Sequence, residues 1–413
     1  MMTGFMLNKR IDFNKYIKYL IVAFAFALPI SKAGTVLFSV LMVLLWLVEG
    51  NFKLKWKELK ESKFIILLFS LIIFSCVSVL WAPDTMFAIE FMRKYWHFLV
   101  IPVIYTSVNK KNINPIIMGF LIGMLISEIV SYGIFFEIIH YKNILPSNPT
   151  PFLDHMNYST YLAFASLLLL NKFFFEDNIR YKILYFMYFL LTTSSLFLNG
   201  SRTGQVIFIG SIFIVGFLNI KNKIKSFIFM TLLIFSIVSI SYKVSPNFNN
   251  RANQAIQDVS MIIVNSDFSG SFGQRVSLWI AGSNIFKDNI LLGTGIGNEL
   301  NGFHYYANKY NFVHYKNMNL DNTGFIDFHN SFVQYAVQLG IIGLILFVGI
   351  FYTLWLNKFT SKQYRNLNII FIIIFVLHST VFYSFHLIHP MVLFALFSAL
   401  LSRISYLEKT ETI

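Results

Sequence analysis

The stretch FIILLFSLIIFSCVSVLW, residues 64–81, decides the fold because it contains no charged side chain. A run of this length forms a helix long enough to cross roughly 30 Å of membrane hydrocarbon. Comparable runs recur along the whole chain, in which 56% of the residues are hydrophobic and only 13% are charged. Such a composition excludes an ordinary water-soluble protein. The sequence therefore predicts an all-α polytopic membrane protein.

The alternative of a membrane β-barrel is rejected, because barrel strands alternate in polarity and these runs are apolar on every face. We predict about 12 transmembrane helices in a single transmembrane domain, residues 1–413. Their predicted ranges are 16–31, 34–50, 63–81, 94–107, 113–135, 157–174, 181–198, 204–219, 225–241, 331–356, 368–385 and 388–404.

Basic residues fix the predicted orientation. The net charge of +14 is divided among short clusters between the apolar runs, which is not the single basic face of a nucleic-acid-binding protein. With both termini in the cytoplasm, 22 of the 33 Lys and Arg residues lie inside, and five lie in the short loops outside. This bias follows the positive-inside rule. It places the long segment 242–330 outside, in the periplasm of a Gram-negative cell.

This segment is predicted to be a large, partly helical periplasmic loop between helices 9 and 10. Apolar spacing predicts helices over Arg251 to Val264 and Gln274 to Phe286. An aromatic cluster follows, suited either to stacking on sugar rings or to the membrane interface. It consists of Phe303, Tyr305, Tyr306, Tyr310, Phe312 and Tyr315.

Arg202 stands in Ser201-Arg202-Thr203-Gly204, directly before a predicted outer helix end. Ser201 or Thr203 is expected to cap that helix, whose amino terminus favours an anion. The Arg202 guanidinium fork matches phosphate oxygens. The competing interpretation is an arginine that reaches the lipid head groups.

Arg275 lies early in the second loop helix, with Trp279 one turn further on the same face. A solvated loop arginine is the competing interpretation. The glycine-rich Gly293-Thr-Gly-Ile-Gly297 that follows is interpreted as a turn, because no strand precedes it as a nucleotide-binding loop would require.

His329 ends the loop, and Asn330 or Ser331 is expected to cap the next helix. A histidine that titrates near pH 6.5 in a wet cleft suits a general base, although an interfacial histidine has the same pattern. Asp327 either orients His329 or is solvated.

Two further groups were considered for ligand binding. Arg93 and Lys94 lie at the outer start of a predicted helix and either help to hold phosphate or contact lipid. His386 and His389 have the spacing of a metal pair, but no carboxylate or cysteine stands beside them and no Asp-x-Asp occurs. We therefore predict no metal site.

Three passages taken in order resemble the O-antigen ligase and O-antigen polymerase superfamily of bacterial membrane glycosyltransferases, most closely the ligases. They are Ser201 to Gly204, Arg275 to Trp279 with the glycine-rich turn, and His329-Asn330-Ser-Phe leading to Gln338-Leu-Gly340-Ile-Ile-Gly343. Gln338 departs from the pattern, since many relatives carry glutamate there, and it is assigned no role.

The resemblance implies a bacterial inner-membrane enzyme without cofactor that transfers O-antigen glycan from undecaprenyl pyrophosphate to a sugar hydroxyl of the lipid A-core. Arg202 and Arg275, helped by Arg93 and Lys94, would grip the pyrophosphate, and His329 would take the acceptor proton. The expected mechanism is a single displacement with inversion. Ser201, Thr203, Trp279, Asp327 and Asn330 would support the site. Membrane lipids are expected partners and nucleic acid is not.

Three alternatives stay open. An O-antigen polymerase uses the same donor, and a protein O-oligosaccharyltransferase is disfavoured by the short tail after the last predicted helix. A lipid-linked glycan transporter also suits twelve helices, with Glu128 as the main acid inside a span, but carriers tend to show internal repeats and we find none.

Overall fold

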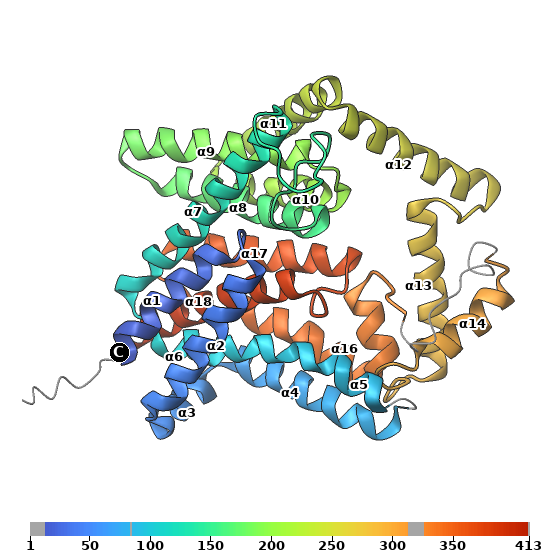
Figure 1. Cartoon of the computed structure of the whole chain (residues 1–413), viewed down its shortest axis with the longest axis horizontal. Coiled ribbons are helices and arrows are strands. Elements are labelled where there is room, and N and C mark those ends of the chain that lie inside the picture. The colour runs from blue at the N-terminus through green and yellow to red at the C-terminus, as the bar shows by residue number, and fades with distance from the viewer. Residues whose placement is uncertain (1–12, 83–84, 313–325, 412–413) are drawn as a thin grey trace, which may run out of the picture.

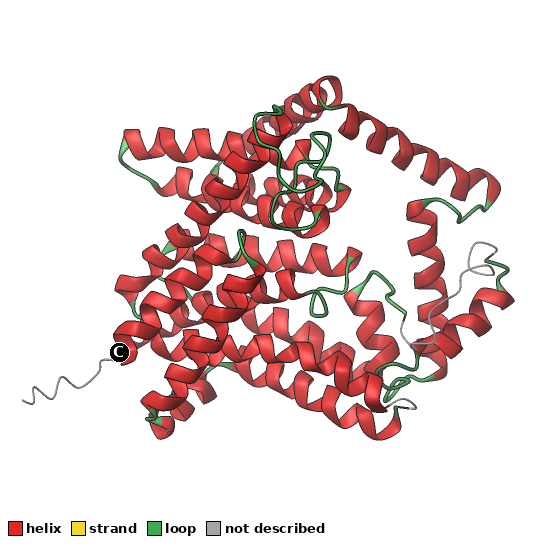
Figure 2. Ribbon diagram, in the orientation of Figure 1, coloured by secondary structure: helices red, strands yellow, loops and turns green. Residues whose placement is uncertain are grey.

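The computed structural model describes residues 13–82, 85–312 and 326–411, and within these ranges it contains helices and no strands (Figure 2). The α-helices are α1 (Phe13–Ala27), α2 (Lys32–Glu49), α3 (Phe52–Glu61), α4 (Lys63–Val77), α5 (Thr85–Met92), α6 (Val100–Ser107), α7 (Lys110–Phe135), α8 (His155–Phe175), α9 (Ile179–Leu198), α10 (Arg202–Asn219), α11 (Lys223–Val244), α12 (Pro246–Asn265), α13 (Ser271–Asp288), α14 (Glu299–Lys309), α16 (Ser331–Trp355), α17 (Lys362–Val381) and α18 (Ile388–Glu411). Two 3₁₀ helices are η1 (Ser78–Trp81) and η2 (Arg93–Leu99).

By length and composition, nine helices in the described part of the chain can cross a membrane. They are α2, α4 with η1, α7, α9, α10, α11, α16, α17 and α18. The chain is therefore a multi-pass membrane protein, and the all-helical prediction is confirmed, whereas the count of twelve spans is not.

The three remaining predicted spans form helices that are too short or too polar to be counted as membrane-spanning. The run at 16–31 is helical only as far as Ala27, where α1 ends after 15 residues, and the run at 94–107 is divided between η2 and α6. The run at 157–174 forms α8, which buries polar side chains such as Asn157 and Asn171. A helix surrounded by other helices does not need to match lipid along its whole surface, because its polar groups find partners inside the protein.

Among the long helices, α9, α17 and α18 run roughly across the view, and α7 crosses it obliquely (Figure 1). Helix α8 packs against α9, α10 and α17, while α16 packs against α4, α13 and α17. Helix α18 contacts α6 and η2, and its apolar window is 83% buried, so it lies at the centre of the bundle.

The segment between α11 and α16 is partly helical, as predicted, and contains α12, α13 and α14 at one end of the bundle (Figure 1). Both predicted loop helices exist, and α12 is extended at both ends. Helix α12 leaves much of its apolar face uncovered, including Ile256 and Ile263. Helices α13 and α14 instead share a small hydrophobic core with the start of α16.

The aromatic cluster divides between this core and the surface. Phe303, Tyr306 and Phe312 are buried in it, and the Tyr306 hydroxyl donates a hydrogen bond of 2.5 Å to Asp288 Oδ2. Tyr305 and Tyr310 stay exposed, so the sugar-stacking and membrane-interface interpretations now concern mainly these two rings. Tyr315 lies outside the described residues.

Candidate active site

Two of the motif residues meet at one aromatic ring. Arg275 on α13 places its guanidinium carbon 5.6 Å from the centre of the Phe382 ring. His329, two residues before α16, packs edge-on against the same ring with 6.1 Å between the ring centres. Phe382 is the C-cap residue that directly follows α17 and is 2% exposed. Segments 107 positions and 53 positions away along the chain from Phe382 therefore converge on it.

Arg202 approaches this place from α10. Its Nη2 donates a hydrogen bond of 3.2 Å to Ser271 Oγ, and its Nη1 lies 3.7 Å from Asp258 Oδ2. The same Asp258 oxygen accepts a hydrogen bond from the backbone N–H of Phe272 at 3.1 Å. These contacts hold the second half of α12 and the start of α13 against the start of α10, where Arg202 lies.

The start of α10 is built differently from the expected cap. Ser201 occupies the N-cap position, but its side chain makes no capping hydrogen bond, and Thr203 does not take over this role. Instead Ser159 of α8 accepts a hydrogen bond from the Gly204 backbone N–H at 3.2 Å. A Cβ atom at Gly204 would lie 2.3 Å from the Ser159 carbonyl oxygen. The glycine therefore permits a close crossing that the sequence motif alone does not reveal.

The two arginines are close enough to influence each other. Burial lowers the pKa of Arg275, the positive charge of Arg202 lowers it further, and Asp327 opposes this shift. Arginine remains protonated in proteins all the same. The shift records a concentration of positive charge in a half-buried place, which favours a ligand with more than one negative charge.

Trp279 and Asp327 hold the segment that carries His329. Trp279 Nε1 donates a hydrogen bond of 3.0 Å to the Phe328 carbonyl oxygen. Asp327 Oδ1 accepts a hydrogen bond of 2.7 Å from the His329 backbone N–H. His329 has a φ of +48°, a left-handed conformation that is uncommon outside glycine, so its backbone depends on such contacts.

The His329 side chain is arranged to be neutral near pH 7. Burial lowers its pKa, Asp327 raises it and Arg275 lowers it, with a net shift downward. Its Nδ1 is buried without a hydrogen-bond partner and lies 3.8 Å from Asp327 Oδ2. Because a neutral imidazole carries no charge, this contact is not an ion pair at neutral pH. A neutral histidine is the form that accepts a proton.

The amino terminus of α16 is fixed to the end of α17. Asn330 is the N-cap, and its side chain accepts hydrogen bonds from Phe332 and Val333 backbone N–H groups at 2.9 and 3.2 Å. Ser331 Oγ donates a hydrogen bond of 2.7 Å to the Phe382 carbonyl oxygen. His329 and Phe382 therefore have a fixed spacing.

Residues 187–348 match a family model described as O-antigen ligase. This region of the chain is similar to that family. It contains Arg202, Arg275 and His329, and it runs from within α9 to within α16. A search of curated proteins gave no match to the chain. The predicted resemblance to the O-antigen ligase and polymerase superfamily is thus confirmed for residues 187–348.

The glycine-rich turn at residues 293–297 docks into a break in α16. Gly340 has φ +65° and ψ −159° inside this helix. The backbone N–H groups of Thr294 and Gly295 donate hydrogen bonds of 2.8 and 3.0 Å to the carbonyl oxygens of Val337 and Gln338. These two N–H groups are therefore used within the protein. This geometry supports the interpretation as a turn.

Lys94 and Arg93 lie in different surroundings. Lys94 Nζ lies 2.8 Å from His386 Nε2. The negative charge of Asp327 acts on the pKa of Lys94, so Lys94 lies near the candidate site. Arg93 is 77% exposed and lies 3.6 Å from Glu90 on the preceding turn. The structure brings Lys94 towards the site, and the described contacts of Arg93 are elsewhere.

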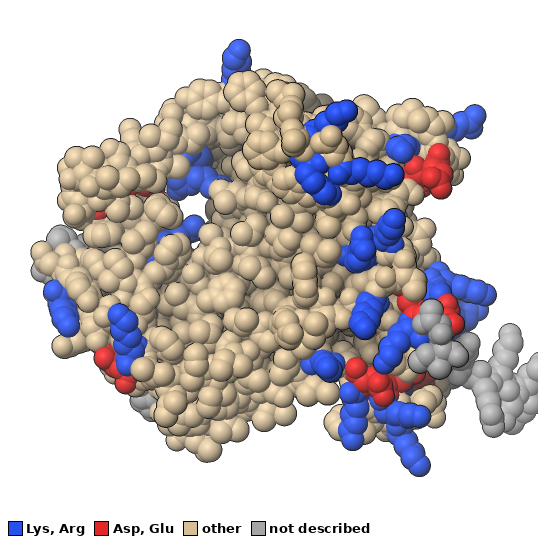
Figure 3. Space-filling model, turned by 180° about the vertical axis from the view of Figure 1, so that it is seen from behind, with Lys and Arg blue, Asp and Glu red and all other residues tan. Residues whose placement is uncertain are grey.

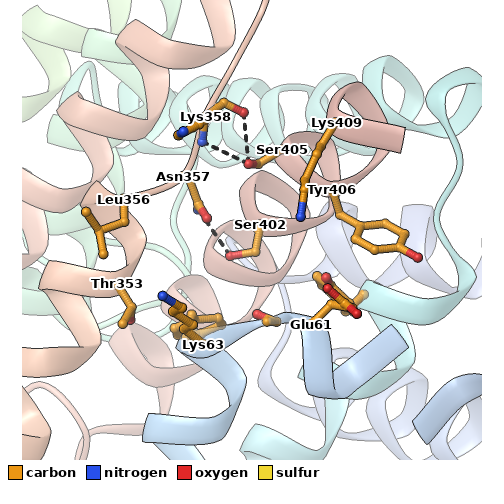
Figure 4. Close-up of a pocket in the computed structure, with 13 residues that line it drawn as sticks. Glu61, Lys63, Thr353, Leu356, Asn357, Lys358, Ser402, Ser405, Tyr406 and Lys409 are labelled. Atoms are coloured by element: carbon orange, nitrogen blue, oxygen red, sulfur yellow. Dashed lines mark hydrogen bonds between the residues drawn. The ribbon is translucent and has the colours of Figure 1, made fainter. Parts of the chain in front are cut away.

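A cavity of about 300 Å³ lies at the other end of the bundle (Figure 4). Lys63, Lys358 and Lys409 line it together with the last turns of α16 and α18. His329, Asn330 and Ser331 stand at the beginning of α16, and a helix of 25 residues is roughly 37 Å long. This cavity therefore does not belong to the candidate active site.

Proposed function

We propose that the chain transfers O-antigen glycan from undecaprenyl pyrophosphate to a sugar hydroxyl of the lipid A-core. The meeting of Arg275 and His329 at Phe382, with Arg202 beside them, carries this proposal. The site must stabilise a polyanionic leaving group and, close to it, activate a weak nucleophile. Two arginines and a neutral histidine are the side chains suited to these tasks.

Arg202 and Arg275 would bind the pyrophosphate of the donor. As the bond between the anomeric carbon and the pyrophosphate oxygen breaks, its electron pair remains on the leaving oxygen. Positive charge that interacts more strongly with this growing negative charge than with the bound donor lowers the barrier. Lys94 would add to the field from η2.

His329 would act as the general base. Asp327 faces its Nδ1 at 3.8 Å, which leaves Nε2 to accept the proton of the acceptor hydroxyl. The hydroxyl oxygen attacks the anomeric carbon on the side opposite the leaving pyrophosphate. One bond forms as the other breaks, so the anomeric configuration inverts. The activated donor removes the need for the paired carboxylates of most glycosidases.

Lipopolysaccharide from cells that carry Arg202→Ala, Arg275→Ala or His329→Ala tests the proposal, at matched levels of folded protein. We expect each variant to lose glycan-capped lipopolysaccharide and to leave glycan on the carrier. Arg251→Ala and His304→Ala are the controls, because these side chains lie elsewhere on α12 and α14. Wild-type capping in all three site variants would refute the proposal.

Gel electrophoresis of this lipopolysaccharide also distinguishes a ligase from a polymerase that uses the same donor. Loss of a ligase leaves the core bare, whereas loss of a polymerase leaves single repeat units on the core. A protein O-oligosaccharyltransferase would instead leave lipopolysaccharide unchanged. For the transporter, purified protein in liposomes gives the answer, because movement of the lipid-linked glycan without a new glycosidic bond would identify a carrier.

We also propose an inner-membrane location with both termini in the cytoplasm, residues 242–330 in the periplasm and the active site facing it. Lys and Arg side chains gather at the end of the molecule that holds α3 and the end of α18 (Figure 3). Positive charge of this kind is retained on the cytoplasmic side. A fluorescent protein fused to the C-terminus should fluoresce, and alkaline phosphatase fused after Lys309 should be active. The reverse pattern would overturn the orientation.

A further inference from the structure

Glu299 is a buried acid that the proposed mechanism does not use. It is the first residue of α14 and is 0% exposed. Its Oε1 accepts hydrogen bonds from the side-chain amides of Gln334, at 3.4 Å, and Gln338. Its Oε2 is buried without a hydrogen-bond partner. A carboxyl group in such a place costs folding free energy, so its presence calls for a functional reason.

The first amide leads from Glu299 to the backbone before His329. Gln334 Oε1 accepts a hydrogen bond of 3.0 Å from the Phe328 backbone N–H. Gln334 Nε2 also donates one of 3.0 Å to the Ile326 carbonyl oxygen. Glu299 therefore orients the glutamine that fixes the two residues on either side of Asp327, and through them the left-handed backbone of His329.

The second amide leads to the other side of the site. Gln338 Oε1 accepts a hydrogen bond of 3.0 Å from the Tyr383 hydroxyl. Tyr383 directly follows Phe382, the ring that contacts both Arg275 and His329. One turn of α16 separates Gln334 from Gln338. The Glu299 carboxyl group thus joins two chains of hydrogen bonds, which we call its two arms. The arm through Gln334 ends at the backbone beside His329, and the arm through Gln338 ends at Tyr383, beside Phe382.

We infer that Glu299 is a positioning residue for glycosyl transfer, which fixes His329 relative to Phe382 and Arg275 through Gln334 and Gln338. This inference rests on the proposed function. The carboxylate accepts from both amides at once and so holds both arms in one geometry. A misplacement of about 1 Å in a reacting group can cost on the order of 10²-fold in rate.

Ionisation of Glu299 should be visible in the reaction. Burial raises its pKa to about 7, against the opposing effect of the Gln338 amide, the nearby backbone N–H groups of Glu299 and Gly297, and the Gln334 amide. Tyr383 is the titratable side chain that reaches this group, through Gln338, and a tyrosine stays neutral at this pH. Activity is expected to rise as Glu299 ionises, because the charged form is the better acceptor.

The decisive experiment exchanges the two side chains in the full-length protein. Glu299→Gln should lower kcat by about 10- to 100-fold, with the donor KM within threefold and a flatter pH profile near 7. Gln338→Glu should be more harmful because it puts two carboxyl groups in contact. The double variant Glu299→Gln with Gln338→Glu restores one carboxyl and one amide, and should recover kcat to within about threefold of wild type by non-additive coupling.

Two results would overturn the inference. One is a Glu299→Gln variant with wild-type kcat and pH profile. The other is a double variant whose fold decrease in kcat equals the product of the fold decreases of the two single variants. Failure of the double variant to fold, when both single variants also fail to fold, has the same meaning, since either result would assign Glu299 a purely structural role. His329→Ala in the same assay separates the two proposals: if it is active, the proposed function fails, and if only the Glu299 variants behave as wild type, the positioning role alone fails.

Discussion

Arg275 and His329 share one neighbour, the Phe382 ring, which the guanidinium meets over its face and the imidazole meets edge-on. A cation–π contact contributes about 0.5–2 kcal/mol and also fixes direction. The ring therefore sets the spacing between the group proposed to hold the leaving pyrophosphate and the group proposed to accept the proton.

Replacement of this ring is the first prediction. Phe382→Leu keeps an apolar side chain but removes the aromatic face, so we expect kcat to fall by about tenfold, equivalent to the loss of one contact of this kind. Phe371→Leu is the matched control, because Phe371 is equally buried in α17 and packs within the bundle. Steady-state transfer by both purified variants is the measurement. Equal rates for the two would contradict a role for Phe382.

The second prediction concerns the pH dependence. Asp327 raises the pKa of His329, whereas burial and Arg275 lower it. In Asp327→Asn the raising effect is lost, so the His329 pKa falls further. A general base must be unprotonated, and activity rises as pH increases through its pKa. The acidic limb of the kcat/KM profile should therefore move to lower pH, with a smaller loss of kcat than in His329→Ala. An acidic limb that stays at the wild-type pH, or moves to higher pH, would contradict the predicted effect of Asp327 on His329.

The third prediction tests the break in α16. A Cβ atom at Gly340 would lie 2.3 Å from the Leu291 carbonyl oxygen, and its backbone conformation is one that essentially only glycine adopts. Gly340→Ala should therefore lower the Tm strongly. Gly50→Ala is the control, since Gly50 also has a positive φ but open space around its Cβ position, and the conformational cost alone is about 1–2 kcal/mol. Similar Tm losses in both would mean that the close approach has no consequence.

The sequence predicts those parts of the site that depend on local signals. Asn330 caps α16 as expected. Arg202 and Arg275 are recognised because each is a charged residue at the start of a helix or inside one. Apolar periodicity also predicts the two loop helices. These features follow from a few neighbouring residues, so one sequence is enough to detect them.

Contacts between distant segments could not be predicted. Ser159 replaces Ser201 as the cap of α10 because α8 crosses it at Gly204, and nothing near Ser201 signals this. Phe382 resembles any apolar residue at the end of a span. Gln338, which had no assigned role, acquires one only when α14 brings Glu299 against it. Tertiary packing alone creates these relationships.

The count of spans differs for a related reason. Hydropathy detects apolar runs but does not tell a lipid-facing helix from one enclosed by protein. Helix α8 is enclosed and tolerates Asn157 and Asn171, while the run at 94–107 begins as the 3₁₀ helix η2 and so places Lys94 beside His386. A 3₁₀ stretch of this length is uncommon.

The most direct test of the central claim is the rate of transfer by purified His329→Ala from undecaprenyl-pyrophosphate-linked glycan to lipid A-core at neutral pH. His304→Ala, an exposed histidine of α14, serves as the control. We predict that kcat falls by about 10² to 10⁴ in His329→Ala while the donor KM stays within threefold. A kcat within threefold of wild type would contradict the assignment of His329 as the general base.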